Sequence, residues 1–135
     1  MLISTVQLDT PYYVLMSEKQ RIGPTATRLN SDVACNPIYG FSTKEAYDRF
    51  CTKSEQPLTP YPLVTFYLRE QIELPGGGLN LVVVDAVGPA ESCLYASTMQ
   101  SVLDAHDNRL PQVAIDYRLT FDPIANAYQI EESPI

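Results

Sequence analysis

The sequence predicts a single α+β domain over residues 1–135, with a mixed or mainly antiparallel sheet of five to six strands, two helices and a C-terminal β-hairpin. Three observations point to this fold. The length of 135 residues is close to the commonest size of one domain. Short runs of β-branched and aromatic residues recur between prolines and glycines, and the last third alternates apolar and polar residues up to a turn. Helix-start signals stand between these runs, and a chain with both kinds of signal is typical of an α+β fold.

The first third of the chain is expected to be extended. Residues 12–16 (YYVLM) form a β-prone run after Pro11 and predict the first strand. Residues 25–29 (TATRL) alternate weakly and predict another. Residues 33–41 (VACNPIYGF) are expected to be extended at best, because Pro37 cannot donate to a ladder of hydrogen bonds.

The clearest helix signal lies in residues 41–51 (FSTKEAYDRFC). Ser42 followed by Glu45 forms a capping box, in which the hydroxyl accepts from the Glu45 amide and the carboxylate reaches back to the Ser42 amide. We therefore expect a helix that begins at Ser42. The three prolines within residues 54–62 (SEQPLTPYP) then predict a linker without regular structure.

Two further strands are expected around a glycine turn in the middle of the chain. Residues 63–72 (LVTFYLREQI) are rich in β-branched and aromatic residues. Residues 79–87 (LNLVVVDAV) contain four consecutive apolar residues, which predicts a strand covered on both faces. A phosphate-binding loop places its glycines between a strand and a following helix, whereas residues 76–78 (GGG) precede a strand. They therefore predict a turn rather than a phosphate site.

A second helix and a hairpin are expected in the last third. Residues 89–106 predict the helix, with Pro89 as its first residue. Residues 112–121 (QVAIDYRLTF) alternate throughout and predict one half-exposed strand. Its apolar face would carry Val113, Ile115, Tyr117, Leu119 and Phe121. Turn residues at 122–126 and a returning run at 127–132 close a hairpin at a sheet edge.

Charge and composition narrow the classes of partner. Acidic residues outnumber basic ones 16 to 9, so the net charge is -7, and the basic residues are scattered. This field repels phosphate backbones and anionic lipids, so we expect no nucleic-acid partner and no membrane partner. The start of the chain lacks a signal-peptide pattern and no apolar run approaches the ~20 residues of a membrane span, which predicts a cytoplasmic protein. Cys35, Cys51 and Cys93 are odd in number and widely spaced, which suits neither a disulfide framework nor a zinc site. They predict buried, reduced thiols.

Asp85 and His106 are the residues that invite a catalytic interpretation. Asp85 stands at the carboxyl end of a buried strand, where open α/β sheets place ligand groups. Alternatively, it bonds the turn amides of Val87 and Gly88. His106 is flanked by acidic residues, but possible nucleophiles on the same helix cannot converge with it on one atom. We expect no catalytic role for His106, little effect of its removal on stability, and no cofactor or metal site.

The C-terminal hairpin offers a different kind of site. Its first strand would present Asp116 and Arg118 on the face opposite the apolar one, and Glu131 follows on the returning strand. A terminal edge strand can accept a strand from another chain, and the carboxylates would attract a basic protein partner. The alternative is a face that is merely solvated.

The first two thirds of the chain contain the stretches YYVLM, PIYGFSTKEAYDRF and LNLVVVDAVGP, in that order. In this order of features, residues of about 10–90 resemble the N-terminal domain of the SseB (enhanced serine sensitivity) family. Tyr39 and Gly40 interrupt the proline-hydrophobe-Phe-Ser/Thr pattern, and residues 85–89 replace a tight Asn-Pro turn. The resemblance implies a small α/β scaffold without established catalytic residues, used as a partner-binding or accessory module.

Together these patterns predict a non-enzymatic, acidic protein-binding or accessory module. The alternative is a small enzyme or small-molecule-binding domain centred on Asp85, with Tyr67 or His106. An enzyme requires a concave pocket where polar groups converge, whereas a binding module requires an exposed patch.

Overall fold

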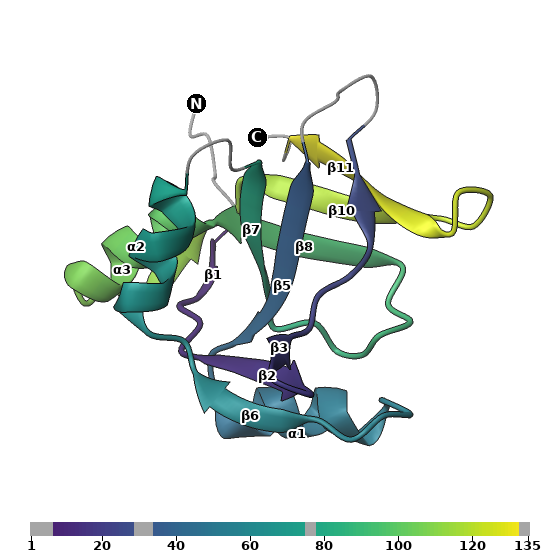
Figure 1. Cartoon of the computed structure of the whole chain (residues 1–135), viewed down its shortest axis with the longest axis horizontal. Coiled ribbons are helices and arrows are strands. Elements are labelled where there is room, and N and C mark those ends of the chain that lie inside the picture. Colours follow the sequence, from purple (N-terminus) through teal and green to yellow (C-terminus); the bar gives the residue numbers. More distant parts are fainter. Residues whose placement is uncertain (1–6, 29–33, 75–77, 133–135) are drawn as a thin grey trace, which may run out of the picture.

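The computed structural model describes residues 7–28, 34–74 and 78–132. These residues form three helices, a mostly antiparallel nine-stranded sheet and a separate two-stranded sheet, β1 with β9 (Figure 1). The coarse prediction of an α+β fold with a mainly antiparallel sheet is confirmed, but the predicted numbers of helices and strands are too low. The helices are α1 (Lys44–Thr52), α2 (Thr65–Glu73) and α3 (Met99–Asp107). The strands are β1 (Gln7–Asp9), β2 (Tyr13–Ser17), β3 (Gln20–Arg21), β4 (Ala26–Thr27), β5 (Cys35–Phe41), β6 (Thr59–Pro62), β7 (Leu79–Val84), β8 (Cys93–Thr98), β9 (Gln112–Ala114), β10 (Tyr117–Asp122) and β11 (Ala127–Glu132).

The centre of the large sheet is the parallel pair β5 and β7. The strand order is β3-β2-β5-β7-β8-β10-β11-β4, and β6 pairs with β2 outside this order. Parallel neighbours need a crossover connection, and here α1, β6 and α2 provide it. Because β5 and β7 run in the same direction, their carboxyl ends meet, which brings Ser42 and Asp85 together.

Both faces of β7 are covered, as the four consecutive apolar residues predicted. Leu81 and Val83 belong to a core cluster that includes Phe50 of α1. Val82 and Val84 face a second cluster, which contains Leu68, Met99 and Val102 from α2 and α3. In Figure 1, α2 and α3 lie together at one side of the sheet and α1 lies elsewhere, beside β2 and β6.

β5 is a regular strand inside the sheet, although Pro37 led us to expect an extended segment at best. The amide of Tyr39 donates to the Ile22 carbonyl at 3.0 Å, on the side away from β7. Residues 37 and 39 are two positions apart in the strand, so their backbone nitrogens face the same side. The missing N–H of Pro37 therefore faces away from β7, and the β5–β7 ladder loses no hydrogen bond. Gly23 lies so close that a Cβ there would stand 1.8 Å from the Pro37 oxygen.

The helix predicted from the capping box forms, but one residue later than expected. α1 has Thr43 as its N-cap, and the Thr43 hydroxyl accepts from the Ala46 amide at 3.1 Å. On the exposed side of α1, Lys44 and Asp48 are paired at 2.5 Å. Ser42 is therefore not the cap, and its hydroxyl has another partner.

Two predictions between residues 54 and 73 are wrong. Residues 59–62 were expected to lack regular structure, but β6 pairs with β2 as an antiparallel edge strand. Residues 63–72 were expected to form a strand, but α2 forms there. Leu68 is buried, Ile72 is partly buried against the same cluster, and their spacing of one helical turn overrides the β-propensity of the segment.

The predicted helix at 89–106 is wrong in its first half. Leu94 and Ala96 are buried while Tyr95 between them is exposed, the alternation of a strand, and β8 pairs with both β7 and β10. The helix begins at Met99, where the Thr98 hydroxyl accepts from the Ser101 amide at 3.1 Å.

The long alternating segment 112–121 is two strands rather than one. β9 joins β1, and β10 joins β8 after a break at which the Asp116 amide donates to the Ala96 carbonyl at 2.9 Å. Val113 and Ile115 therefore reach one core cluster and Leu119 the other. The hairpin itself is confirmed, with β10 and β11 paired along their length.

The hairpin does not form the outermost strand of the sheet. β4 pairs in parallel with Tyr128 and Gln129 of β11 and covers part of its outer side. β4 is also the short form of the strand predicted at 25–29, of which residue 29 lies outside the described residues. Gly76 and Gly77 of the predicted glycine turn lie outside them as well.

Candidate functional site

Asp85 lies where the carboxyl ends of β5 and β7 meet. Its carboxylate accepts the Ser42 amide N–H at 2.8 Å and the Ser42 hydroxyl at 2.7 Å. The Asp85 amide donates in turn to the Gly40 carbonyl at 2.9 Å, and the residue has a left-handed φ of 51°. Asp85 therefore connects the end of β7 to the segment that enters α1.

This geometry differs from the turn bonding considered for Asp85. Its carboxylate oxygens point to Ser42, and the Val87 amide donates instead to the Glu91 carboxylate at 3.2 Å. The carboxylate also stands just before the first turn of α1, where a helix attracts a negative group. An external phosphate or carboxylate would compete with Asp85 for this position.

Asp116 has a similar place at the start of α3. One of its carboxylate oxygens accepts the Thr98 amide N–H at 3.1 Å and the Ser101 hydroxyl at 3.2 Å. The Ser97 hydroxyl lies 3.5 Å from the same oxygen. Asp116 was expected beside Arg118 on an exposed hairpin face. The structure directs its carboxylate to the first turn of α3 instead.

The hairpin brings together Arg118 and Glu131, two of the residues expected at its surface. They are directly opposite each other on β10 and β11 and form an ion pair at 2.8 Å. The hydrogen bond and the charge of Glu131 raise the pKa of the Arg118 guanidinium above its usual value. Tyr95 of β8 stands beside Arg118 on the same face and is 40% exposed. This face is therefore mixed in charge rather than acidic.

His106 and Tyr67 hold elements of the fold together. The Nε2 atom of His106 lies 2.7 Å from the Pro11 carbonyl, and its ring stacks on Tyr12 with centroids 4.7 Å apart. The Arg21 guanidinium lies over the Tyr67 ring at 3.5 Å. Burial raises the pKa of the Tyr67 phenol, and Arg21 opposes that rise. Neither residue approaches Asp85 in a hydrogen bond among the described contacts.

Two hollows of the surface lie away from Asp85, Asp116 and His106. One, of about 440 Å³, is polar and lies along the β2–β3 hairpin and Gln56. Another, of about 160 Å³, lies between Lys53 and the loop from Val87 to Glu91. Neither is lined by Asp85, Asp116 or His106.

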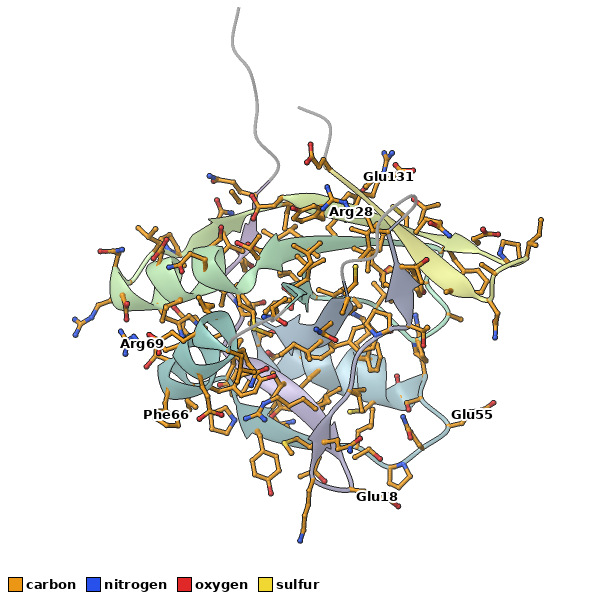
Figure 2. The ribbon with its side chains drawn as sticks, turned by 45° about the horizontal axis from the view of Figure 1, so that its top comes forward. Glu18, Arg28, Glu55, Phe66, Arg69 and Glu131 are labelled. Atoms are coloured by element: carbon orange, nitrogen blue, oxygen red, sulfur yellow. The ribbon has the colours of Figure 1, made fainter. Side chains whose placement is uncertain are left out.

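Four exposed apolar side chains belong to the β6–α2 junction and to the residue that precedes β2, and we call them together the Phe66 patch. It consists of Tyr12, Tyr61, Val64 and Phe66, which are 43%, 51%, 43% and 73% exposed. The Leu63 amide donates to the Tyr12 carbonyl at 2.8 Å and fixes the β6–α2 junction against the start of β2. In Figure 2, Phe66 lies at the outer side of α2, far from Glu131 on the hairpin.

Sequence reasoning missed the Phe66 patch because it assigned residues 63–72 to a strand. On the helix that forms, Phe66, Arg69, Glu70 and Glu73 share one face at i, i+3, i+4 and i+7. If residues 63–72 are assigned to a helix, Phe66 falls on the same face as three charged residues. That assignment would have identified Phe66 as an exposed ring.

Comparisons with protein-family models, with curated proteins and with solved structures found no match to this chain. Within the described residues, none of the helices has the length and apolar character that a bilayer crossing requires. The same residues hold no cluster of three or more His, Cys, Asp or Glu suited to a metal ion. The cysteines are half-buried, and burial raises the pKa of the Cys35 and Cys51 thiols, which lowers their reactivity.

Proposed function

We propose that this chain is a non-enzymatic, acidic protein-binding module that acts in the cytoplasm and binds its partner through the Phe66 patch. The observation that carries the proposal is the exposure of Phe66, which keeps 73% of its surface open at the first turn of α2. Phe66 is bordered by the polar residues Arg69, Glu70 and Glu73, and an exposed apolar surface with a polar border is typical of a protein-binding site.

The composition of the Phe66 patch supports this assignment. Tyrosine and phenylalanine are enriched in the cores of protein interfaces because they offer large apolar area with few rotatable bonds. The Phe66 patch combines Tyr12, Tyr61 and Phe66 on backbone that is held by the β2–β6 ladder and by α2. A preorganised surface loses little conformational entropy when it binds.

The internal contacts of the polar candidates support a non-enzymatic role. Asp85 uses both carboxylate oxygens on Ser42, and Asp116 is engaged at the start of α3. His106 is held against Pro11 and Tyr12. A catalytic group needs an oxygen or nitrogen within reach of a substrate, and the contacts of these side chains are to other groups of the fold. An accessory role also agrees with the proposed resemblance to the SseB N-terminal domain.

The test is photo-cross-linking inside the native cell. A photo-reactive phenylalanine analogue replaces Phe66 in one version of the chain and Ile124 in another. Ile124 is the matched control because it is an apolar side chain at the hairpin turn with 96% exposure. We expect a discrete protein adduct from position 66 and none from position 124.

The opposite pattern would contradict the proposal. An adduct from position 124 alone would move the interface to the C-terminal hairpin, beside Arg118 and Glu131. Equal adducts from both positions would indicate non-specific encounter, and the absence of adducts at position 66 would remove the Phe66 patch from the interface.

A further inference from the structure

We infer that the partner places a lysine or arginine side chain in the hollow beside Phe66, which deepens the proposed function and rests on it. The hollow has a volume of about 290 Å³ and is lined by Phe66, Arg69, Glu70 and Glu73 of α2. Pockets for small molecules begin at about this size, so it suits one long side chain better than a whole ligand.

The charges around this hollow are unequal. Arg69 donates to both carboxylate oxygens of Asp107 at 3.0 Å, so its charge is already balanced by α3. Glu70 and Glu73 are exposed and form no ion pair or hydrogen bond within the described part of the chain. The hollow therefore offers a carboxylate pair to a cation, in a chain whose net charge is -7.

Phe66 supplies the other half of the recognition. A lysine or arginine carries an aliphatic stem that packs on an apolar surface, and its charged end is attracted to the face of an aromatic ring. Phe66 precedes Glu70 by one helical turn, so a side chain lying along α2 can contact the ring and reach a carboxylate. Figure 2 shows Phe66 and Arg69 together on this outer side of α2.

The neighbouring edge of the sheet determines how the partner docks. The Leu63 amide points to Tyr12 on the β2 side, so by alternation the Tyr61 amide does too, and positions 60 and 62 face outward. Both are prolines and offer no N–H, so β6 cannot accept a further strand by the usual ladder. Recognition here relies on side chains rather than on strand addition.

Selection of short random peptides displayed on phage, against the immobilised full chain, tests the inference. We expect the recovered peptides to carry lysine or arginine next to apolar residues. Their binding should fall about 30-fold on Phe66→Ala, as for an interface hot spot. It should fall about fivefold or more on the double variant Glu70→Gln/Glu73→Gln, as for exposed ion pairs.

The matched control is Glu18→Gln/Glu55→Gln, which makes the same change in net charge at two exposed residues distant from Phe66 in Figure 2. Binding to this control should equal that of the wild type. Added salt should weaken binding to the wild type and have much less effect on Glu70→Gln/Glu73→Gln, because screening removes a contribution that the variant already lacks.

The outcomes separate the inference from the proposed function. If the peptides bind Phe66→Ala more weakly but bind Glu70→Gln/Glu73→Gln as they bind the wild type, the cation site is wrong and the Phe66 patch is still the interface. Peptides that bind every variant equally, or no enrichment over an unrelated immobilised protein, would overturn both.

Discussion

Asp85 accepts both the amide and the hydroxyl of Ser42, at 2.8 and 2.7 Å, and so fastens the end of β7 to the entry of α1. The two residues are 43 positions apart in the chain and meet because β5 and β7 are parallel neighbours. The residue most suggestive of a ligand site is thus part of the framework that holds the parallel pair and its helix.

Removing the Ser42–Asp85 contact should destabilise the protein because the hydrogen bonds between these two residues are lost, not because the N-cap of α1 is lost. Asp85→Asn should lower the free energy of unfolding by about 1–3 kcal/mol, because a charge-assisted hydrogen bond is lost. Ser42→Ala should cost about 1 kcal/mol. Asparagine tolerates the left-handed backbone at this position, so the change tests the carboxylate alone.

Urea unfolding of a double-mutant cycle provides the measurement and its control. Ser42→Ala and Asp85→Asn should be less costly together than the sum of the two. Thr43→Ala, which removes the actual N-cap, should cost about 1 kcal/mol and add independently to Asp85→Asn. Additive effects of Ser42 and Asp85 would show that the contact does not stabilise the fold.

Asp116→Asn should also destabilise the protein, by about 1–3 kcal/mol, because its carboxylate satisfies the Thr98 amide and the Ser101 hydroxyl. Ser101→Ala removes one of these donors and should show a smaller loss. Chemical unfolding measures both changes. An unchanged midpoint for Asp116→Asn would return Asp116 to the list of surface residues available to a partner.

His106→Ala should lower stability by about 1–2 kcal/mol, contrary to the expectation from sequence that its removal has little effect. The variant loses the contact to the Pro11 carbonyl and the stacking on Tyr12. Thermal unfolding measures the loss, and Asp104→Ala, at an exposed position on the same helix, provides the comparison. Equal midpoints for wild type and His106→Ala would show that these contacts contribute nothing.

Tyr39 should make the protein sensitive to alkali. Burial raises the pKa of the Tyr39 phenol far above its ordinary value of 10.0, and Tyr128 and Glu91 add to the rise. The unfolded chain therefore loses this proton first, and the stability present below pH of about 10 is lost as the pH rises above it. Tyr39→Phe should retain more of its neutral-pH stability under alkaline conditions than the wild type.

Denaturant midpoints between neutral and alkaline pH measure this effect. Tyr61→Phe changes an exposed tyrosine and should follow the wild-type curve. If Tyr39→Phe and the wild type lose stability equally with rising pH, the buried phenol is not the cause of the alkaline sensitivity.

Local patterns predicted the strands and the hairpin better than the helices. The strands predicted at 12–16 and 79–87 form at Tyr13–Ser17 and Leu79–Val84, and the predicted hairpin forms from Tyr117 onward. α2 was missed because the β-propensity of Thr65 to Tyr67 conceals the helical spacing of Leu68 and Ile72, and tertiary burial decides such cases. The strand β8 was missed because its pairing with β7 and β10 is a long-range property.

The candidate site could be predicted only in part. Asp85 was singled out by its position at the end of a strand, and Asp116 by its place on a face of the predicted hairpin strand. Their hydrogen-bond partners lie 43 and 18 positions away and depend on strand pairing, so the sequence did not indicate them. Arg118 and Glu131 face each other because of the hairpin register, which depends on the turn. The Phe66 patch required the correct secondary structure of α2 before its exposure could be inferred.

Phe66 is exposed, whereas the Asp116 carboxylate accepts a hydrogen bond at the start of α3. We therefore expect Phe66 to contribute to binding and Asp116 to contribute to stability. The most direct measurement is the affinity of the partner, captured from native cells on the tagged wild-type chain, for purified Phe66→Ala and Asp116→Asn. We predict that Phe66→Ala binds about 30-fold more weakly with an unchanged unfolding midpoint, whereas folded Asp116→Asn has a lower midpoint and wild-type affinity. Wild-type affinity in Phe66→Ala together with a loss of affinity in folded Asp116→Asn would contradict this assignment.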